Sequence, residues 1–193
     1  MDKKPDRLLM MERVRIATIA SIIGSGDICR AVASTVSKAL DKTITDTGRV
    51  GPTVADAVAE TAGGAILGAI EVGADLKDAG RGIVVGVLRG TTQARAGVPE
   101  IIKHTAQAVV RHTVEAGGDI EATAMGMVQG ATEGAAELGL GVELAATVAR
   151  NSALQAAREH GFTVSQIFRT SETQPIIGLL SASSEPGVAL AAR

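Results

Sequence analysis

Glycine recurs at a fixed spacing along the chain, and this spacing constrains the fold more than any other feature of the sequence. A 22-residue series, interrupted only at Arg95, contains Gly51, Gly73, Gly117, Gly139 and Gly161. Three residues after each position of the series comes an aliphatic residue: Val54, Leu76, Val98, Ile120, Val142 and Val164. Residue-by-residue similarity is clearest at 44 residues, where residues 69–76 match residues 113–120. The sequence therefore predicts repeats of 22 residues, paired into units of 44.

The residues around each glycine are typical of the end of one helix and the start of the next. Glycine readily adopts the left-handed conformation that closes a helix. Two residues later, an Asp or Thr side chain can accept the free backbone N–H groups of the following helix. We therefore predict helix caps at Asp27, Thr53, Asp75, Asp119 and Thr163, with Asp27 opening an earlier unit. Thr163 and Gln166 also match the capping-box pattern.

This pattern predicts an all-α fold of about seven or eight antiparallel helices, because the short turns leave no room for another arrangement. Turns are expected at Gly51, Gly73, Gly97, Gly117, Gly139 and Gly161. We divide the chain into N-terminal capping helices (residues 1–50), a helical-repeat region (51–162), and the start of a last helix with a C-terminal tail (163–193). An apolar segment at 176–180 interrupts the polar tail and is expected to dock elsewhere.

A spacing of 22 residues also has a second interpretation. It is twice 11, the period of continuous amphipathic helices that lie on lipid and of right-handed supercoils. Under this interpretation the glycines would be hinges within long helices. A Gly-x-Asp or Gly-x-Thr step ends a helix better than it bends one, which favours discrete helices.

Further glycines, spaced four residues apart, are expected to lie inside the predicted helices. Glycine in a helix interior costs up to about 1 kcal/mol relative to alanine, so these rows need a packing reason. Close approach of two helices supplies one, as in glycine zippers. The rows could pack within the chain, between subunits, or inside a membrane. The predicted helix-packing or oligomer-interface residues are Gly64, Gly68, Gly82, Gly86, Gly90, Gly126, Gly130 and Gly134.

The composition favours oligomerisation and excludes several functional classes. Ala (33) and Gly (23) dominate a chain with two Phe, no Tyr and no Trp, so each buried residue contributes little transfer energy. The net charge is −2 with no Lys/Arg stripe, which argues against a nucleic-acid partner. One cysteine, no apolar stretch of spanning length and no signal-peptide pattern predict a soluble, cytoplasmic protein.

No catalytic, cofactor-binding or metal-binding constellation is expected. His104 and His112 are eight residues apart, which is too far along one helix to chelate an ion together. His160 is placed at a helix C-terminus, where a cation is favourable. Cys29 lies near a helix start, where the dipole could lower its pKa, but no His neighbours it in sequence. Gly24-Ser25-Gly26 lacks the Lys-Ser/Thr of a phosphate loop.

Residues 70–76 and 130–136 resemble stretches of uncharacterised Ala/Gly-rich helical-repeat proteins of bacteria. More loosely, the small-residue helices are similar to phasins, which coat hydrophobic granules, and to 22-residue apolipoprotein repeats. This resemblance implies helical repeats and carries no functional residue over. We expect a non-catalytic structural or assembly protein that is a homo-oligomer or binds a protein partner. The alternative is a peripheral lipid-surface or granule-coating protein.

Overall fold

The chain folds into α-helices joined by short connections. The computed structural model describes residues 4–47, 51–92 and 97–163, and within these ranges it contains seven helices and no strand. This confirms the all-α prediction. The helices are α1 (Lys4–Ser25), α2 (Ile28–Thr47), α3 (Gly51–Glu71), α4 (Leu76–Gly90), α5 (Val98–Glu115), α6 (Ile120–Glu137) and α7 (Val142–Glu159).

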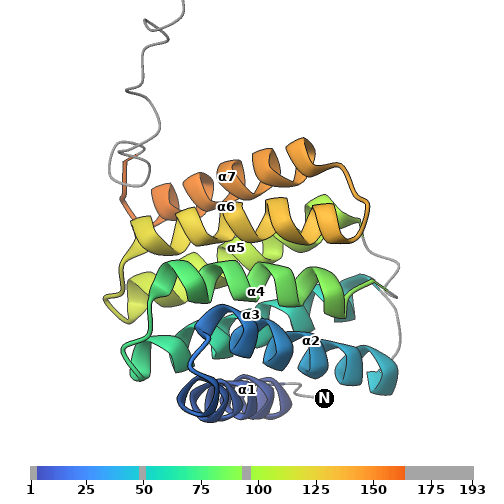
Figure 1. Ribbon diagram of the computed structural model, residues 1–193, viewed down its shortest axis with the longest axis vertical. Coiled ribbons are helices and arrows are strands. Elements are labelled where there is room, and N and C mark those ends of the chain that lie inside the picture. The colour runs from blue at the N-terminus through green and yellow to red at the C-terminus, as the bar shows by residue number, and fades with distance from the viewer. Residues whose placement is uncertain (1–3, 48–50, 93–96, 164–193) are drawn as a thin grey trace, which may run out of the picture.

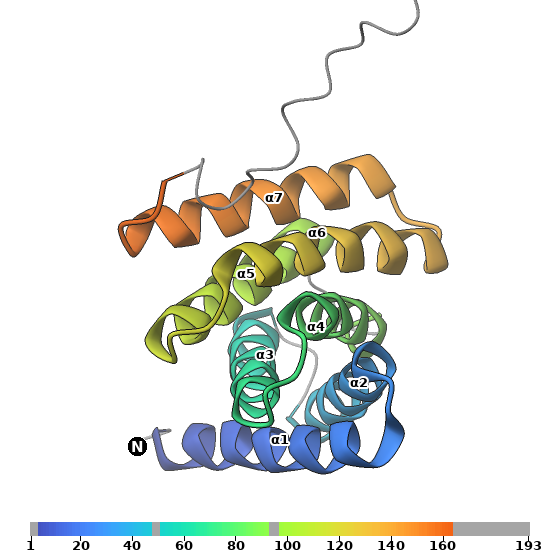
Figure 2. The same cartoon turned by 60° about the vertical axis from the view of Figure 1, so that its left-hand side comes forward.

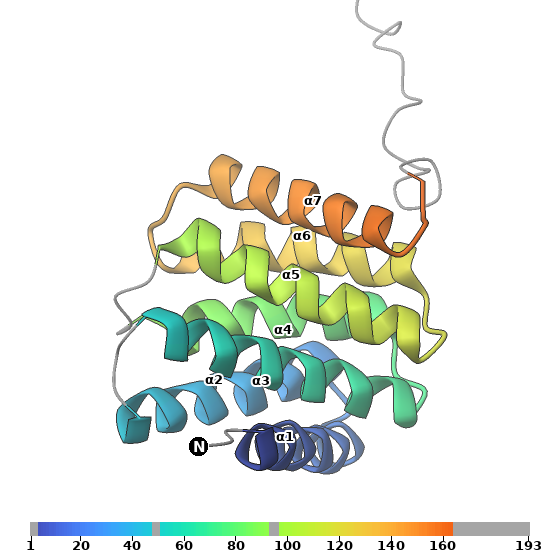
Figure 3. The ribbon, with the colours of Figure 1, turned by 180° about the vertical axis from the view of Figure 1, so that it is seen from behind.

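The helices form a stack two layers deep. Helices α2, α4 and α6 lie side by side in one layer (Figure 1), and α3, α5 and α7 lie in the other (Figure 3). The most extensive contacts join helices that are two apart along the chain. From α2 onward the direction alternates, whereas α1 runs across one end of the stack beneath α2 and α3 (Figure 2). Helix α7 lies at the opposite end.

Left-handed glycines separate most of the helices. Gly26, Gly73, Gly117, Gly139 and Gly161 have φ values between 66° and 86°. The helices α4, α5, α6 and α7 begin at four members of the aliphatic series, which are Leu76, Val98, Ile120 and Val142. At three junctions a carboxylate caps the next helix by accepting a backbone N–H: Asp27 from Arg30 (2.9 Å), Asp75 from Lys77 and Asp78 (2.9 and 3.0 Å), and Asp119 from Ala122 (3.0 Å).

The start of α3 differs from the prediction. Gly51 is the first residue of α3 and does not close the preceding helix, and Thr53, predicted as a cap, lies inside α3. Pro52 accounts for the earlier start, because its fixed φ suits the first turn and its missing N–H needs no partner there. Gly97 immediately precedes α5 and serves as its cap residue, with φ −69° and no side chain to accept a hydrogen bond.

Part of the predicted C-terminal organisation lies outside the described residues. Thr163 follows α7, but Gln166, its predicted capping-box partner, lies beyond the described part. The same is true of the tail from residue 164 onward, including the apolar segment 176–180.

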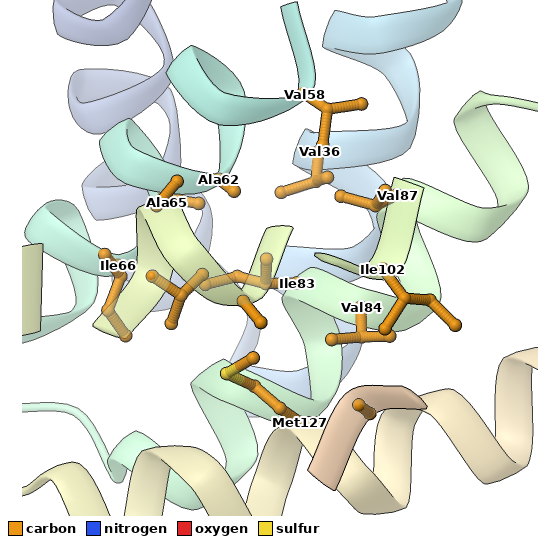
Figure 4. Packing of buried hydrophobic residues seen from close by; sticks show 14 of the residues in the cluster. Val36, Val58, Ala62, Ala65, Ile66, Ile83, Val84, Val87, Ile102 and Met127 are labelled. Carbon is orange, nitrogen blue, oxygen red and sulfur yellow. The ribbon is translucent and has the colours of Figure 1, made fainter. Parts of the chain in front are cut away.

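The core lies between the two layers and changes in character along the stack. Near the middle, Val36 of α2, Ile66 of α3, Ile83 of α4, Ile102 of α5 and Met127 of α6 are buried (Figure 4). Towards α7 the buried side chains are mostly alanines: Ala131, Ala135, Ala145, Ala149, Ala153, Ala156 and Ala157. Small side chains bring helices close together but bury less apolar area, so the α7 end gains less from burial than the middle.

The caps give a test of the helix boundaries. Asp119→Ala removes the acceptor for the Ala122 N–H and should lower the free energy of unfolding by about 1 kcal/mol, or the melting temperature by roughly 2–4 °C. Gly141 caps α7 without a side chain, and a Cβ added there meets only ordinary contacts. Gly141→Asp should therefore leave the melting temperature unchanged or raise it slightly. A fall on both substitutions, measured by circular dichroism, would contradict this assignment.

Candidate functional site: the glycine rows and the outer face of α1

The glycine row of α4 faces the backbone of α2. A Cβ atom built on Gly82 would lie 2.5 Å from the carbonyl oxygen of Cys29, and one built on Gly86 would lie 2.6 Å from that of Ala33. At Gly90 the nearest atoms are the Leu40 Cβ and the carbonyl oxygen of Ser37, both 2.9 Å away. Cβ atoms do not approach backbone oxygens this closely. The two helices therefore meet backbone to backbone, and only glycine fits.

The rows of α6 and α3 make the same kind of contact with other helices of the chain. A Cβ on Gly126 or Gly130 would overlap the carbonyl oxygens of Lys77 and Arg81 in α4, and one on Gly134 would lie 2.7 Å from Leu88 Cδ1. A Cβ built on Gly64 would overlap the carbonyl oxygen of Met11 in α1, and one built on Gly68 would lie 2.7 Å from that of Arg15.

These contacts share one register. A step of four residues along the glycine row corresponds to a step of four residues along the facing helix. The groove formed by the glycines therefore receives a ridge of the facing helix. Glycine Cα–H groups next to carbonyl oxygens add weak attraction to the dispersion energy. All eight predicted glycines thus face helices of the same chain, so their row faces are not available to a second copy.

Two further glycines support close contacts that the four-residue rows did not indicate. Gly80 lies against α6, where an added Cβ would be 2.6 Å from the Thr123 carbonyl oxygen. It is two residues from Gly82, or about 200° around the helix, so α4 has a glycine contact on each side. Gly63 faces His112, where an added Cβ would lie 2.6 Å from Cδ2 of the imidazole. Both glycines can be read from the sequence, but neither belongs to a row with four-residue spacing, so the spacing did not single them out.

Ion pairs connect the exposed edges of the same helix pairs. Arg81 of α4 pairs with Glu133 of α6 at 2.7 Å, and Arg89 pairs with Glu137 at 2.8 Å. Arg15 of α1 pairs with Glu71 of α3. The side chains are between 27% and 52% exposed, so each pair contributes little to stability. Arg81 and Arg89 of α4 are thus partners of carboxylates in α6, whereas the residues between them are buried.

The cysteine and the histidines, which are the candidates for catalysis or metal binding, do not form a cluster. Burial raises the pKa of the Cys29 thiol, and the nearby Arg81 only partly offsets this, so the thiol form is favoured. His104 pairs with Glu100 at 3.1 Å, and His160 is the C-cap of α7. Within the described ranges no group of three His, Cys, Asp or Glu side chains could hold a metal ion.

His112 is the most buried of the three histidines. Its side chain is 12% exposed, lies against Gly63, and places Nδ1 3.0 Å from Glu115 and Nε2 3.1 Å from Arg111. This arrangement suits a neutral ring that donates from Nδ1 and accepts at Nε2. Burial lowers the pKa of His112 below its ordinary value of 6.5, and the charge of Arg111 lowers it further.

The outer face of α1 carries most of the exposed large apolar side chains. Leu9, Ile16 and Ile23 are 54%, 55% and 74% exposed, and they follow one another at seven-residue spacing. The fourth such residue in the described chain, Leu144 of α7, is 59% exposed. Its exposed neighbours on α7 are polar: Glu143, Thr147, Arg150, Asn151, Gln155, Arg158 and Glu159. The two ends of the stack are therefore unlike: α7 presents a mainly polar surface and α1 an apolar stripe.

The chain matches no model of a known protein family, and no curated protein sequence matches it. Among the described residues, no helix is both long enough and apolar enough to cross a membrane. The function is therefore inferred from the geometry of the chain alone.

Matched glycine substitutions test the close contacts. Gly86→Ala and Gly130→Ala should lower the free energy of unfolding by about 1–3 kcal/mol, because the new Cβ must displace backbone atoms. Gly24→Ala is the control, since its Cβ would meet nothing within 4 Å and alanine is the better helix former. Thermal melts would measure the difference, and a higher melting temperature for Gly86→Ala or Gly130→Ala would refute these contacts.

The environment of His112 predicts a pH dependence of stability. Its pKa is lowered in the fold, so the unfolded chain takes up more protons as pH falls through 6.5 and below. The His112 contribution to stability is therefore complete at pH 7.5 and is lost towards pH 5.5. His112→Gln should reduce the difference in melting temperature between these two pH values. Equal pH dependence in the parent and His112→Gln would show that His112 does not titrate in this way.

Proposed function

We propose that this protein is a non-catalytic structural or assembly component that self-associates or serves as a scaffold subunit of a larger complex. The observation that carries the proposal is the apolar stripe on α1. Monomeric proteins rarely leave aligned large apolar side chains in water, and such patches mark interaction sites. Here three of them lie on one helix, at one end of a stack whose other end is mainly polar.

The internal glycines hold the helices of the chain together, and the α1 stripe binds the partner. In this proposal, the 22-residue repeats pack through glycine-zipper rows within the chain and hold the helices at short, fixed distances. A Cβ added anywhere along these rows would meet neighbouring backbone or side-chain atoms, which supports a stiff frame. A stiff stack can present its end at a defined position, which is what an assembly component requires.

The alanine-rich end of the core also favours association. Buried alanines contribute little transfer energy, and the chain has almost no aromatic residues to compensate. Covering Leu9, Ile16 and Ile23 in an interface would add buried apolar area that the chain alone does not provide.

The size of the particle tests the proposal. Light scattering of the full chain from 5 to 200 µM should give a mass that rises above that of one 19.5 kDa chain. If the chain serves a hetero-complex, affinity purification from its native cells should instead return a protein partner in a stoichiometric amount. A monomer at every concentration together with an affinity purification that yields no partner would rule the proposal out.

A lipid or granule surface is the second candidate, because the same α1 stripe could lie on an apolar surface. Interfacial helices normally combine such a stripe with Trp or Phe anchors and a Lys/Arg-rich face. Helix α1 has no aromatic residue, and its segment from Ile16 to Ser25 has no charge. Flotation with vesicles of phosphatidylethanolamine and phosphatidylglycerol separates the two candidates: an assembly protein stays at the bottom of the gradient, and a lipid-surface protein rises.

A further inference from the structure

We propose that the occupant of the α1 stripe is a second copy of this chain, with the two α1 helices antiparallel about a twofold axis at Ile16. This inference rests on the proposed assembly function and names its partner. A twofold interface uses the same surface on both subunits, so the surface must be complementary to itself. The stripe meets this requirement in its spacing, charge and side-chain size.

The spacing of the stripe is symmetric. Leu9 and Ile23 lie seven residues before and after Ile16, or about 10 Å along the helix axis in each direction. In the antiparallel arrangement Ile16 meets the partner's Ile16, and Leu9 meets the partner's Ile23. A seven-residue spacing keeps successive side chains almost in line, with a drift of only about 20° per step. Three apolar layers therefore form along one seam.

The distribution of charge selects the antiparallel direction. From Leu9 onward, where the side chains of α1 are described, the exposed charged residues are Arg13 and Glu12, which pairs with Arg15 of the same helix. Both precede Ile16, and the exposed side chains after Ile16 are uncharged. Antiparallel pairing places Glu12 opposite the partner's Ala20, so each charged half covers an uncharged one. Parallel pairing in the same layers would place Glu12 near the partner's Glu12, and like charges that face each other across an interface disfavour binding.

Side-chain size is complementary in the same direction. The exposed residues of the second half that flank the stripe are small: Ala17, Ala20 and Gly24. They leave room for the longer Glu12 and Arg13 side chains of the partner. A Cβ added to Gly24 would meet nothing within 4 Å in the single chain, so space is available at this end of the helix.

The position of α1 allows this pairing without rearrangement. Val14 and Thr18 are buried on the inner face of α1, where they lie against Gly64 and Gly68 of α3. Leu9, Ile16 and Ile23 are exposed. Helix α1 itself lies at the end of the stack (Figure 2). Because one helix from each copy makes the contact, the interface is smaller than the usual 1,200–2,000 Å². We expect a dissociation constant on the order of 10–100 µM.

Sedimentation velocity of the full chain from 5 to 400 µM tests the partner and the surface. The parent should dimerise, and Ile16→Glu should weaken the dimer at least tenfold because it places two carboxylates at the twofold axis. Leu144→Glu makes the same kind of change at the other end of the stack and should leave dimerisation unchanged. Mixing Ile16→Glu with Ile16→Lys should restore association. Melts of each variant alone check that the fold is retained.

Cysteine cross-linking tests the direction. In a Cys29→Ser background, oxidation should join Ile16→Cys to itself and Leu9→Cys to Ile23→Cys, and should leave Leu9→Cys alone uncoupled. Efficient coupling of Leu9→Cys to itself would overturn the antiparallel arrangement.

The remaining outcomes separate this inference from the function on which it rests. A parent that associates equally well with Ile16→Glu would overturn the role of α1 and leave assembly intact. A parent that is monomeric to 400 µM would overturn the pairing, and affinity purification would then decide the assembly function. Vesicle flotation that is lost in Ile16→Glu would assign the stripe to lipid and overturn the second copy as its occupant.

Discussion

The close backbone contact between helices two apart along the chain is the interaction on which the rest of the structure depends. Carbonyl oxygens of α1, α2 and α4 lie where side chains would otherwise stand on α3, α4 and α6. Glycine lowers the helix propensity of these segments. The closer approach of the helices adds dispersion contacts that offset this cost. Because the contact repeats in steps of four residues, it sets both the distance between the helices and their register.

This constraint explains why the chain has an unusual core. Helices that meet backbone to backbone leave little volume for aromatic side chains, so the space between the layers is filled by Val, Ile, Leu and Ala. Burial then contributes less per residue than in most domains of this size. The large apolar side chains exposed on α1 are the main exception to an otherwise well-covered apolar surface. They are also the natural place for further burial.

The unlike ends of the stack follow from its linear construction. In a linear stack of helices each helix contacts only those beside it, so the helices at the two ends decide what the ends present. At one end, α7 presents mainly charged and polar residues, which suit contact with water. At the other, α1 uses its inner face for α3 and presents Leu9, Ile16 and Ile23 outward. The proposed self-association would therefore use the α1 end.

The sequence by itself determined the helical class and most helix boundaries. Glycine at Gly73, Gly117, Gly139 and Gly161 and the carboxylates of Asp75 and Asp119 act within a few residues of themselves, so their effect can be recognised locally. Gly51 misled the prediction because the adjacent Pro52, also a local signal, starts α3 earlier. The regular rows likewise identified Gly86 and Gly130 as residues that need a close neighbour.

Only the tertiary structure decided which neighbour that is. The spacing of a row is the same whether it packs against its own chain, a second subunit or lipid. The stack assigns the α4 row to α2 and the α6 row to α4. It also placed Leu9, Ile16 and Ile23 on the outward face of the first helix. Periodicity shows which residues share a face of a helix, but the face that is covered depends on residues more than 40 positions away, and no local pattern encodes that contact.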